Sequence, residues 1–270
     1  MTYRLYRKYV ALGDSLTEGL GDDGFSKNRK DKGWADRLAN LMACEAANVG
    51  QSFSYANLAV RGQNTLSILT CQLELALEMK PDIVTIMTGA NDLRSLNERL
   101  PSMLALLRGA VTRFQAIGTK VVLISLAQPA HLSFAKAFVH RSKVWAETLE
   151  ELSKELDVEL VNVNQMSVFK SLHYWSGDLV HYSAKGHIKI ANSVAEKLGL
   201  EVRDNSEPVE VLERLSVMHM LKWSIVDVLP FIGRQLRGVN AGTGMEPKEL
   251  NLRELTREVE EFDNFELQVA

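Results

Sequence analysis

The sequence predicts a parallel α/β fold, and three observations support that prediction. Up to about residue 200, short apolar runs alternate with longer segments of helical periodicity. Residues 82–87 (DIVTIM) are rich in β-branched side chains, which is typical of a strand buried on both faces. Polar loops follow the predicted strands, at the end of a parallel sheet where ligand crevices form.

The predicted elements follow one another in regular order. Strands are expected at residues 9–12, 55–60, 82–87, 120–126 and 158–163. Helices are expected at residues 34–46, 65–79, 97–117, 138–156 and 183–198. Ser183 is a candidate N-cap of the last helix and Gly199 its stop. In the helix at 65–79, one face is expected to be apolar; its members are Leu66, Leu69, Leu73, Ala76 and Leu77.

Residues 201–270 differ in character from residues 1–200, so we predict a domain at 1–200 followed by a helical C-terminal extension with a charged tail. A polar linker at 201–208 leads to a largely apolar segment at 209–236, and residues 248–266 are expected to form a short solvated helix. The segment at 209–236 could pack on the domain, form a homo-oligomer contact, cover the site as a lid, or lie at a lipid interface. Its apolar anchors would be Trp223, Leu229 and Phe231.

Composition excludes several classes of protein. With 46% hydrophobic and 24% charged residues, the chain has the profile of a soluble globular protein, and its net charge of -3 gives no nucleic-acid footprint. No apolar run has the length of a membrane span or a signal sequence, so a cytoplasmic location is expected. Cys44 and Cys71 are expected to be reduced, partly buried thiols. No metal-ligand spacing is present, and we expect neither a metal nor a cofactor.

Ser15 is the first candidate for chemistry. It stands in Gly13-Asp14-Ser15-Leu16, directly after the first predicted strand. A serine hydroxyl is a weak nucleophile unless a base removes its proton, and a neighbouring glycine lets substrate approach the backbone. The N–H of Ser15 could also donate to a developing oxyanion. The structural alternative is that Ser15 only caps a helix or turn.

Residues 19–24 match the pattern Gly-x-Gly-x-x-Gly, which occurs in dinucleotide-binding folds. The first glycine comes well after the strand end, and Asp22 and Asp23 would repel a pyrophosphate. We therefore interpret this stretch as a flexible loop near the mouth of the site.

Four stretches resemble, in the same order, the conserved blocks of the SGNH/GDSL hydrolase family. They are ALGDSLTEG at 11–19, NLAVRGQNT at 57–65, TGANDL at 88–93 and DLVHYSAKGH at 178–187. The segment at 209–236 more loosely resembles C-terminal extensions of some actinobacterial members. The resemblance implies a three-layer, flavodoxin-like sandwich around a parallel sheet of about five strands. It also implies a serine esterase that works through an acyl-enzyme without a cofactor.

The resemblance assigns a role to each matching residue. Ser15 is the expected nucleophile, His181 the general base, and Asp178 the residue that orients His181. The oxyanion hole is expected from the N–H groups of Ser15 and Gly62 and from the side chain of Asn91. Asp14 and Asp92 are expected to brace their loops, and His187 to be structural.

Several functions remain open at this point. A small-molecule ester is the expected substrate, and acetyl esters of sugars, lysophospholipids, short aliphatic esters and acyl thioesters all fit. An acyltransferase or a thioesterase would use the same residues. A ligand-binding protein without activity is a further alternative, because a fold does not by itself imply a function.

Overall fold

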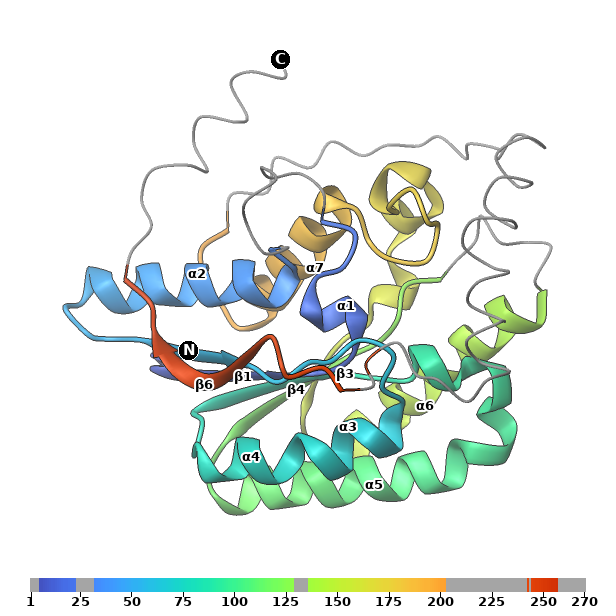
Figure 1. The fold of residues 1–270 in the computed structure, drawn as a ribbon, viewed down its shortest axis with the longest axis horizontal. Coiled ribbons are helices and arrows are strands. Elements are labelled where there is room, and N and C mark those ends of the chain that lie inside the picture. The colour runs from blue at the N-terminus through green and yellow to red at the C-terminus, as the bar shows by residue number, and fades with distance from the viewer. Residues whose placement is uncertain (1–4, 23–31, 129–135, 203–241, 243, 257–270) are drawn as a thin grey trace.

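The computed structural model describes residues 5–22, 32–128, 136–202, 242 and 244–256. These residues form a sandwich of two helical layers around one sheet (Figure 1). Helices α2 (Trp34–Asn48) and α7 (Ala184–Lys197) cover one face of the sheet. The other face is covered by α3 (Thr65–Cys71), α4 (Leu73–Glu78), α5 (Leu96–Ala116) and α6 (Lys136–Glu155). The α/β class predicted from the sequence is confirmed.

Five strands of the sheet run parallel. They are β1 (Lys8–Leu12), β2 (Ser54–Asn57), β3 (Ile83–Met87), β4 (Lys120–Ile124) and β5 (Glu159–Val161). Their order, β5-β4-β3-β1-β2, is the flavodoxin-like order. The connection from β1 leads to β2 on one side of it, and the connection from β2 leads back across β1 to β3 on the other side. In such sheets the ligand crevice lies at the carboxyl ends of the strands where the order reverses, here between β1 and β3. All five residues of β3 are buried, which explains why four of them are apolar.

A sixth strand corrects the prediction for the C-terminal region. Strand β6 (Glu249–Glu254) pairs antiparallel with β2, whereas the sequence analysis predicted a helix at 248–266. Without β6, the outer edge of β2 would present unpaired N–H and C=O groups. In the described residues, the extension therefore completes the sheet of the first domain. The domain boundary near residue 200 stays a prediction, and residues 203–241, with the segment at 209–236, lie outside the described part.

Of three smaller expectations, those for the helix at 65–79 and for Cys71 need correction, and the one for the ends of α7 is confirmed. The helix predicted at 65–79 is interrupted at Gln72, and Leu66, expected on its apolar face, is 56% exposed. Both cysteines are free, but Cys71 is exposed rather than partly buried. Ser183 caps α7 by accepting from the Gly186 N–H, and Gly199 follows the helix end with a φ of 75°, as predicted.

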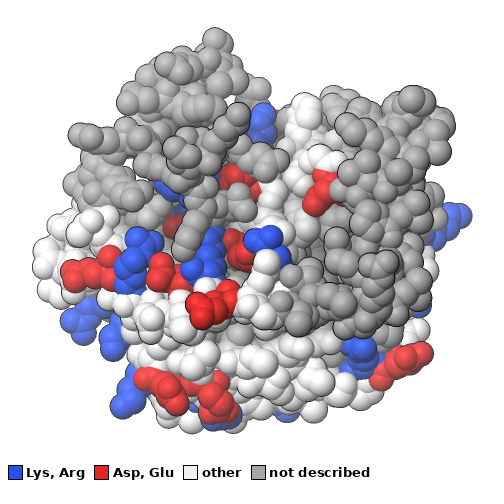
Figure 2. All heavy atoms as spheres, in the orientation of Figure 1, with Lys and Arg blue, Asp and Glu red and all other residues white. Residues whose placement is uncertain are grey.

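Positive and negative side chains are interspersed on the face of the described residues shown in Figure 2. Among the described helices, none combines the length and apolarity that a bilayer crossing requires.

Candidate active site

Ser15 lies where the chain leaves the sheet. Strand β1 ends at Leu12, and the short helix α1 (Ser15–Glu18) begins at the serine. Asp14 caps this helix because its carboxylate accepts from the Leu16 N–H at 3.0 Å. The fold thereby brings the serine hydroxyl to the carboxyl end of the central strand, in the crevice between β1 and β3.

A hydrogen-bonded chain of three side chains joins Ser15 to the late loop. The Nε2 atom of His181 lies 2.9 Å from the Ser15 Oγ, and its Nδ1 atom lies 2.5 Å from Oδ2 of Asp178. The loop is closed at its base, where the Ser176 N–H donates to the His181 carbonyl at 2.8 Å. The sequence therefore predicted correctly that these three side chains meet.

Asp178 is held as an anion. Its Oδ1 accepts from the Ser176 hydroxyl at 2.5 Å, the Val180 N–H at 3.0 Å and the His181 N–H at 2.9 Å. Burial alone would raise the pKa of this carboxyl, but the hydrogen bond to His181, the charge of its ring and the bond from Ser176 hold the pKa well below its ordinary value. An ionised Asp178 accepts from Nδ1–H, so Nε2 is left to accept the serine proton.

Asn91 contacts both segments that are expected to supply oxyanion donors. Its Nδ2 donates to Oδ2 of Asp14 at 3.0 Å and to the Gln63 carbonyl at 2.9 Å. Within the described residues, the N–H groups of Ser15 and Gly62 donate to no backbone carbonyl. Asn91, by contrast, has acceptors for both amide hydrogens and must exchange or share one to bind an oxyanion.

The two acidic residues beside these groups brace their loops. Asp92 accepts from the N–H and the hydroxyl of Thr65, both at 2.8 Å, and from Arg99 at 3.3 Å. Burial raises the pKa of Asp14 to about 6, against the lowering effects of the Leu16 N–H, the nearby His181 and the Asn91 amide. The structure thus agrees with a bracing role for each.

His187 is buried and takes no part in the relay. Its Nδ1 accepts from the Trp34 N–H at 3.1 Å, and its Nε2–H donates to the Leu20 carbonyl at 3.2 Å. Burial lowers its pKa to about 3, so the ring is neutral. The structural role predicted for this histidine is confirmed.

The described part of the Gly-x-Gly-x-x-Gly stretch packs against the histidine loop. Gly21 has a φ of 90°, and a Cβ there would come within 2.9 Å of the His181 Cβ and 2.6 Å of the Tyr182 carbonyl. Asp22 is buried in an ion pair with Arg37 at 2.9 Å. Residues 19–22 are therefore a packed support rather than the flexible loop expected there; residues 23–31 lie outside the description.

Three residues that support the site lie outside the four sequence blocks: Ser176, Trp145 and Gln72. The Ser176 hydroxyl donates to Asp178. Trp145 of α6 donates from Nε1 to the Thr88 carbonyl at 2.8 Å and lies so close to Gly89 that a Cβ there would come within 2.3 Å of it. The side-chain amide of Gln72 forms hydrogen bonds with the N–H and the carbonyl of Gly13. Ser176 could have been found from its place two residues before Asp178, whereas Trp145 and Gln72 offered no local signal.

The C-terminal segment packs against the loop that carries Gly62. Lys248 donates to the Glu18 carbonyl at 2.5 Å and to Asp36 at 2.6 Å, and Glu18 forms an ion pair with Arg61. A Cβ at Gly242 would come within 2.2 Å of the Arg61 carbonyl. The extension therefore helps to fix the neighbour of one expected oxyanion donor.

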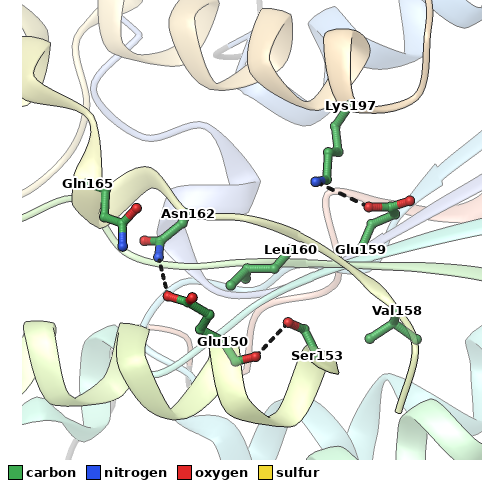
Figure 3. A pocket seen from close by; sticks show the side chains of 8 residues that line it. All are labelled: Glu150, Ser153, Val158, Glu159, Leu160, Asn162, Gln165 and Lys197. Carbon is green, nitrogen blue, oxygen red and sulfur yellow. Dashed lines mark hydrogen bonds and ion pairs between the residues drawn. The ribbon is translucent and has the colours of Figure 1, made fainter. Parts of the chain in front are cut away.

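A cavity of about 270 Å³ lies at the other edge of the sheet, beside β5 (Figure 3). Several of its polar groups contact one another: Lys197 forms an ion pair with Glu159 at 3.3 Å, and the Asn162 amide donates to Glu150 at 3.5 Å. The lining residues include none of the expected site residues. In the described ranges, no cluster of His, Cys, Asp or Glu has the arrangement of a metal site.

Comparisons with solved structures agree with the fold. Solved structures with similar folds include a catalytic mutant of Axe2, an acetylxylan esterase from Geobacillus stearothermophilus (20% identity, TM-score 0.58, covering 74% of this chain and 97% of that one). TesA is also similar (19%, 0.56, 71% and 99%), as is the lipase Lip_vut3 from a goat rumen metagenome (23%, 0.54, 72% and 98%). A search of curated protein sequences returned no significant match.

A family model provides the assignment. It describes a GDSL-like lipase/acylhydrolase family and matches residues 11–188, which include all four sequence blocks and both ends of the hydrogen-bonded relay. The chain thus belongs to the GDSL-like lipase/acylhydrolase family and is a carboxylic ester hydrolase of the SGNH type.

Proposed function

We propose that the protein hydrolyses esters of small acyl groups or lipid-like acids through an acyl-enzyme on Ser15. The observation that supports this most is the 2.9 Å contact between the Ser15 Oγ and His181 Nε2, with Asp178 on the other ring nitrogen. A nucleophile, a base and a group that orients the base are the minimum set for this chemistry.

The first half-reaction forms the acyl-enzyme. The Ser15 Oγ attacks the carbonyl carbon while His181 Nε2 takes the hydroxyl proton, and Asp178 stabilises the resulting imidazolium. The oxyanion accepts hydrogen bonds from the N–H groups of Ser15 and Gly62 and from Asn91, once Asn91 shares or exchanges an acceptor. The intermediate collapses when the bond to the alcohol oxygen breaks and His181 returns its proton to that oxygen.

The second half-reaction regenerates the serine. Water loses a proton to His181 and attacks the acyl carbon, and the acid leaves as His181 reprotonates Ser15. An alcohol in place of water would give acyl transfer, and a thioester substrate would enter by the same first step. Thioesterase and acyltransferase activities are therefore the second candidates.

The test is hydrolysis of p-nitrophenyl acetate by wild type and Ser15→Ala. We expect wild-type turnover and no turnover by the variant above the uncatalysed rate; equal rates would reject Ser15 as the nucleophile. A series of acyl chain lengths with ester and thioester leaving groups then defines the substrate class. Added alcohols distinguish hydrolysis from transfer through the product ratio.

Three expectations stay predictions: the cytoplasmic location, a small-molecule ester but no nucleic acid as partner, and homo-oligomerisation through residues 201–270.

A further inference from the structure

Gln72 occupies an unusual place in the fold. It sits at the interruption between α3 and α4 and is only 2% exposed. Its side-chain amide accepts from the Gly13 N–H at 3.0 Å and donates to the Gly13 carbonyl at 2.8 Å. The same Nε2 donates to Oε1 of Gln63 at 2.7 Å. A buried glutamine thus joins two loops that are far apart in the sequence.

The need for this amide follows from where the sheet ends. Strand β1 stops at Leu12, and Gly13, which follows it, is still buried. One backbone contact remains there: the Val60 N–H donates to the Gly13 carbonyl at 3.4 Å. Buried peptide groups need partners, and a primary amide supplies one donor and one acceptor in the arrangement of a neighbouring strand. Gln72 therefore extends the hydrogen bonding of β1 to a position two residues before Ser15.

The contact with Gln63 connects Gln72 to the other expected oxyanion donors. Gln63 directly follows Gly62, and its carbonyl accepts from Asn91 at 2.9 Å. The segments that carry Ser15, Gly62 and Asn91 are consequently linked through two glutamine side chains and one asparagine side chain. A change in the position of Gln72 would alter the spacing between the nucleophile and the donors.

We propose that Gln72 is a positioning residue that sets the distance between the nucleophile loop and the oxyanion donors. The proposal rests on the function proposed above. Gln72 acts through Gly13 and Gln63, and among the described residues its side chain forms no hydrogen bond with Ser15 or His181. Its loss should therefore weaken stabilisation of the transition state and leave the serine–histidine relay intact.

The test compares Gln72→Met, which keeps the volume and removes the amide, with Gln115→Met. Gln115 is an exposed glutamine of α5 that donates to the Leu156 carbonyl on the molecular surface. For p-nitrophenyl acetate, we expect kcat of Gln72→Met to fall about 10- to 100-fold, because misplaced oxyanion donors cost somewhat less than removed ones. KM should change by less than about threefold, since the donors act mainly on the transition state, and the shape of the pH profile should stay that of wild type. Gln115→Met should match wild type in all three.

A second variant keeps the proposal testable if Gln72→Met does not fold. Gln63→Met, at a half-buried position, removes only the link between the two glutamines and should lower kcat about three- to tenfold, the worth of one hydrogen bond. Folded Gln72→Met with wild-type kcat would overturn the proposal, and so would Gln63→Met with wild-type kcat where the first variant is unfolded. An inactive wild type would instead reject the proposed function, so the two failures are distinguishable.

Discussion

The two halves of the candidate site are built in different ways. The histidine half is local: Asp178 and His181 lie three residues apart in one short loop, and the Asp178 carboxylate is fixed by donors from residues 176–181. The oxyanion half is assembled from three distant segments, after β1, β2 and β3. Its order depends on side chains such as Gln72 and Trp145, which come from helices.

This difference explains how substitutions should act. A change within the histidine loop affects one compact hydrogen-bonded unit, so its consequences fall on proton transfer. A change in the oxyanion half alters long-range spacing, so it should reduce transition-state stabilisation by amounts that depend on distance from the donors. The predictions below test this contrast, from the largest expected effect to the smallest.

Removal of the nucleophile or of the base should give the largest loss. We expect Ser15→Ala and His181→Ala each to lower kcat by about 10⁴-fold or more, and the double variant to be no worse than either, because the two residues act as a unit. Steady-state kinetics with p-nitrophenyl acetate measures this. Two results would contradict a shared relay: a double variant in which the two single losses add, or a His181→Ala variant with near-wild-type turnover.

Removal of the Asn91 amide should cost less than loss of the relay. We expect Asn91→Ala to lower kcat about 10²- to 10³-fold with little change in KM, as for other single oxyanion donors. Asn48→Ala, at the exposed end of α2, is the matched control and should be neutral. An effect confined to KM would place Asn91 in substrate binding instead.

The buried carboxyl of Asp14 predicts a pH-dependent stability. Because its pKa is raised from 3.8 to about 6 in the fold, its ionisation is harder in the folded than in the unfolded protein. Its contribution is fully present below about pH 4 and is lost as pH rises through 6. The unfolding free energy of Asp14→Asn relative to wild type should thus rise by about 2 kcal/mol between pH 4 and 7.

Urea unfolding at several pH values measures this dependence. Asp157→Asn, at an exposed position, serves as the control and should give a curve parallel to that of wild type. A constant difference between Asp14→Asn and wild type across this pH range would show that Asp14 does not titrate there.

Loss of the Ser176 hydroxyl should have the smallest effect. Asp178 keeps two N–H donors and the ring of His181, so its carboxylate stays ionised. We expect Ser176→Ala to lower kcat about tenfold, through a less fixed Asp178. Ser193→Ala on α7, whose hydroxyl donates to the Lys189 carbonyl, is the control. A loss as large as that of His181→Ala would mean that Ser176 itself takes part in proton transfer.

The contrast also explains what the sequence could predict. The five parallel strands were recognisable because each is a short apolar run with a buried face, and the relay was recognisable because its residues stand in local patterns. Strand β6 was not predicted, since its sequence, ELNLRE, is charged and four of its six residues are exposed. It forms a strand because the N–H and C=O groups at the edge of β2 need hydrogen-bond partners. A local sequence pattern does not show which segment will supply them.

The same limit applies to the support of the site. Gln72 was placed within a continuous helix, because helical periodicity does not show which side chain turns inward to a loop 59 residues away in the sequence. The sequence predicts a flexible loop at residues 19–24, yet Arg37 and His187, which lie elsewhere in the sequence, hold its described part at 19–22. Motifs therefore identified the groups that react, and packing had to identify those that position them.

Covalent trapping tests the central claim most directly. The protein is treated with diethyl p-nitrophenyl phosphate, which phosphorylates activated serines, and the modified residue is located by peptide mass spectrometry. We expect one adduct, on Ser15, formed at a strongly reduced rate in His181→Ala. An adduct on another residue, or ester hydrolysis by wild type that survives after Ser15 has been fully modified, would contradict the account.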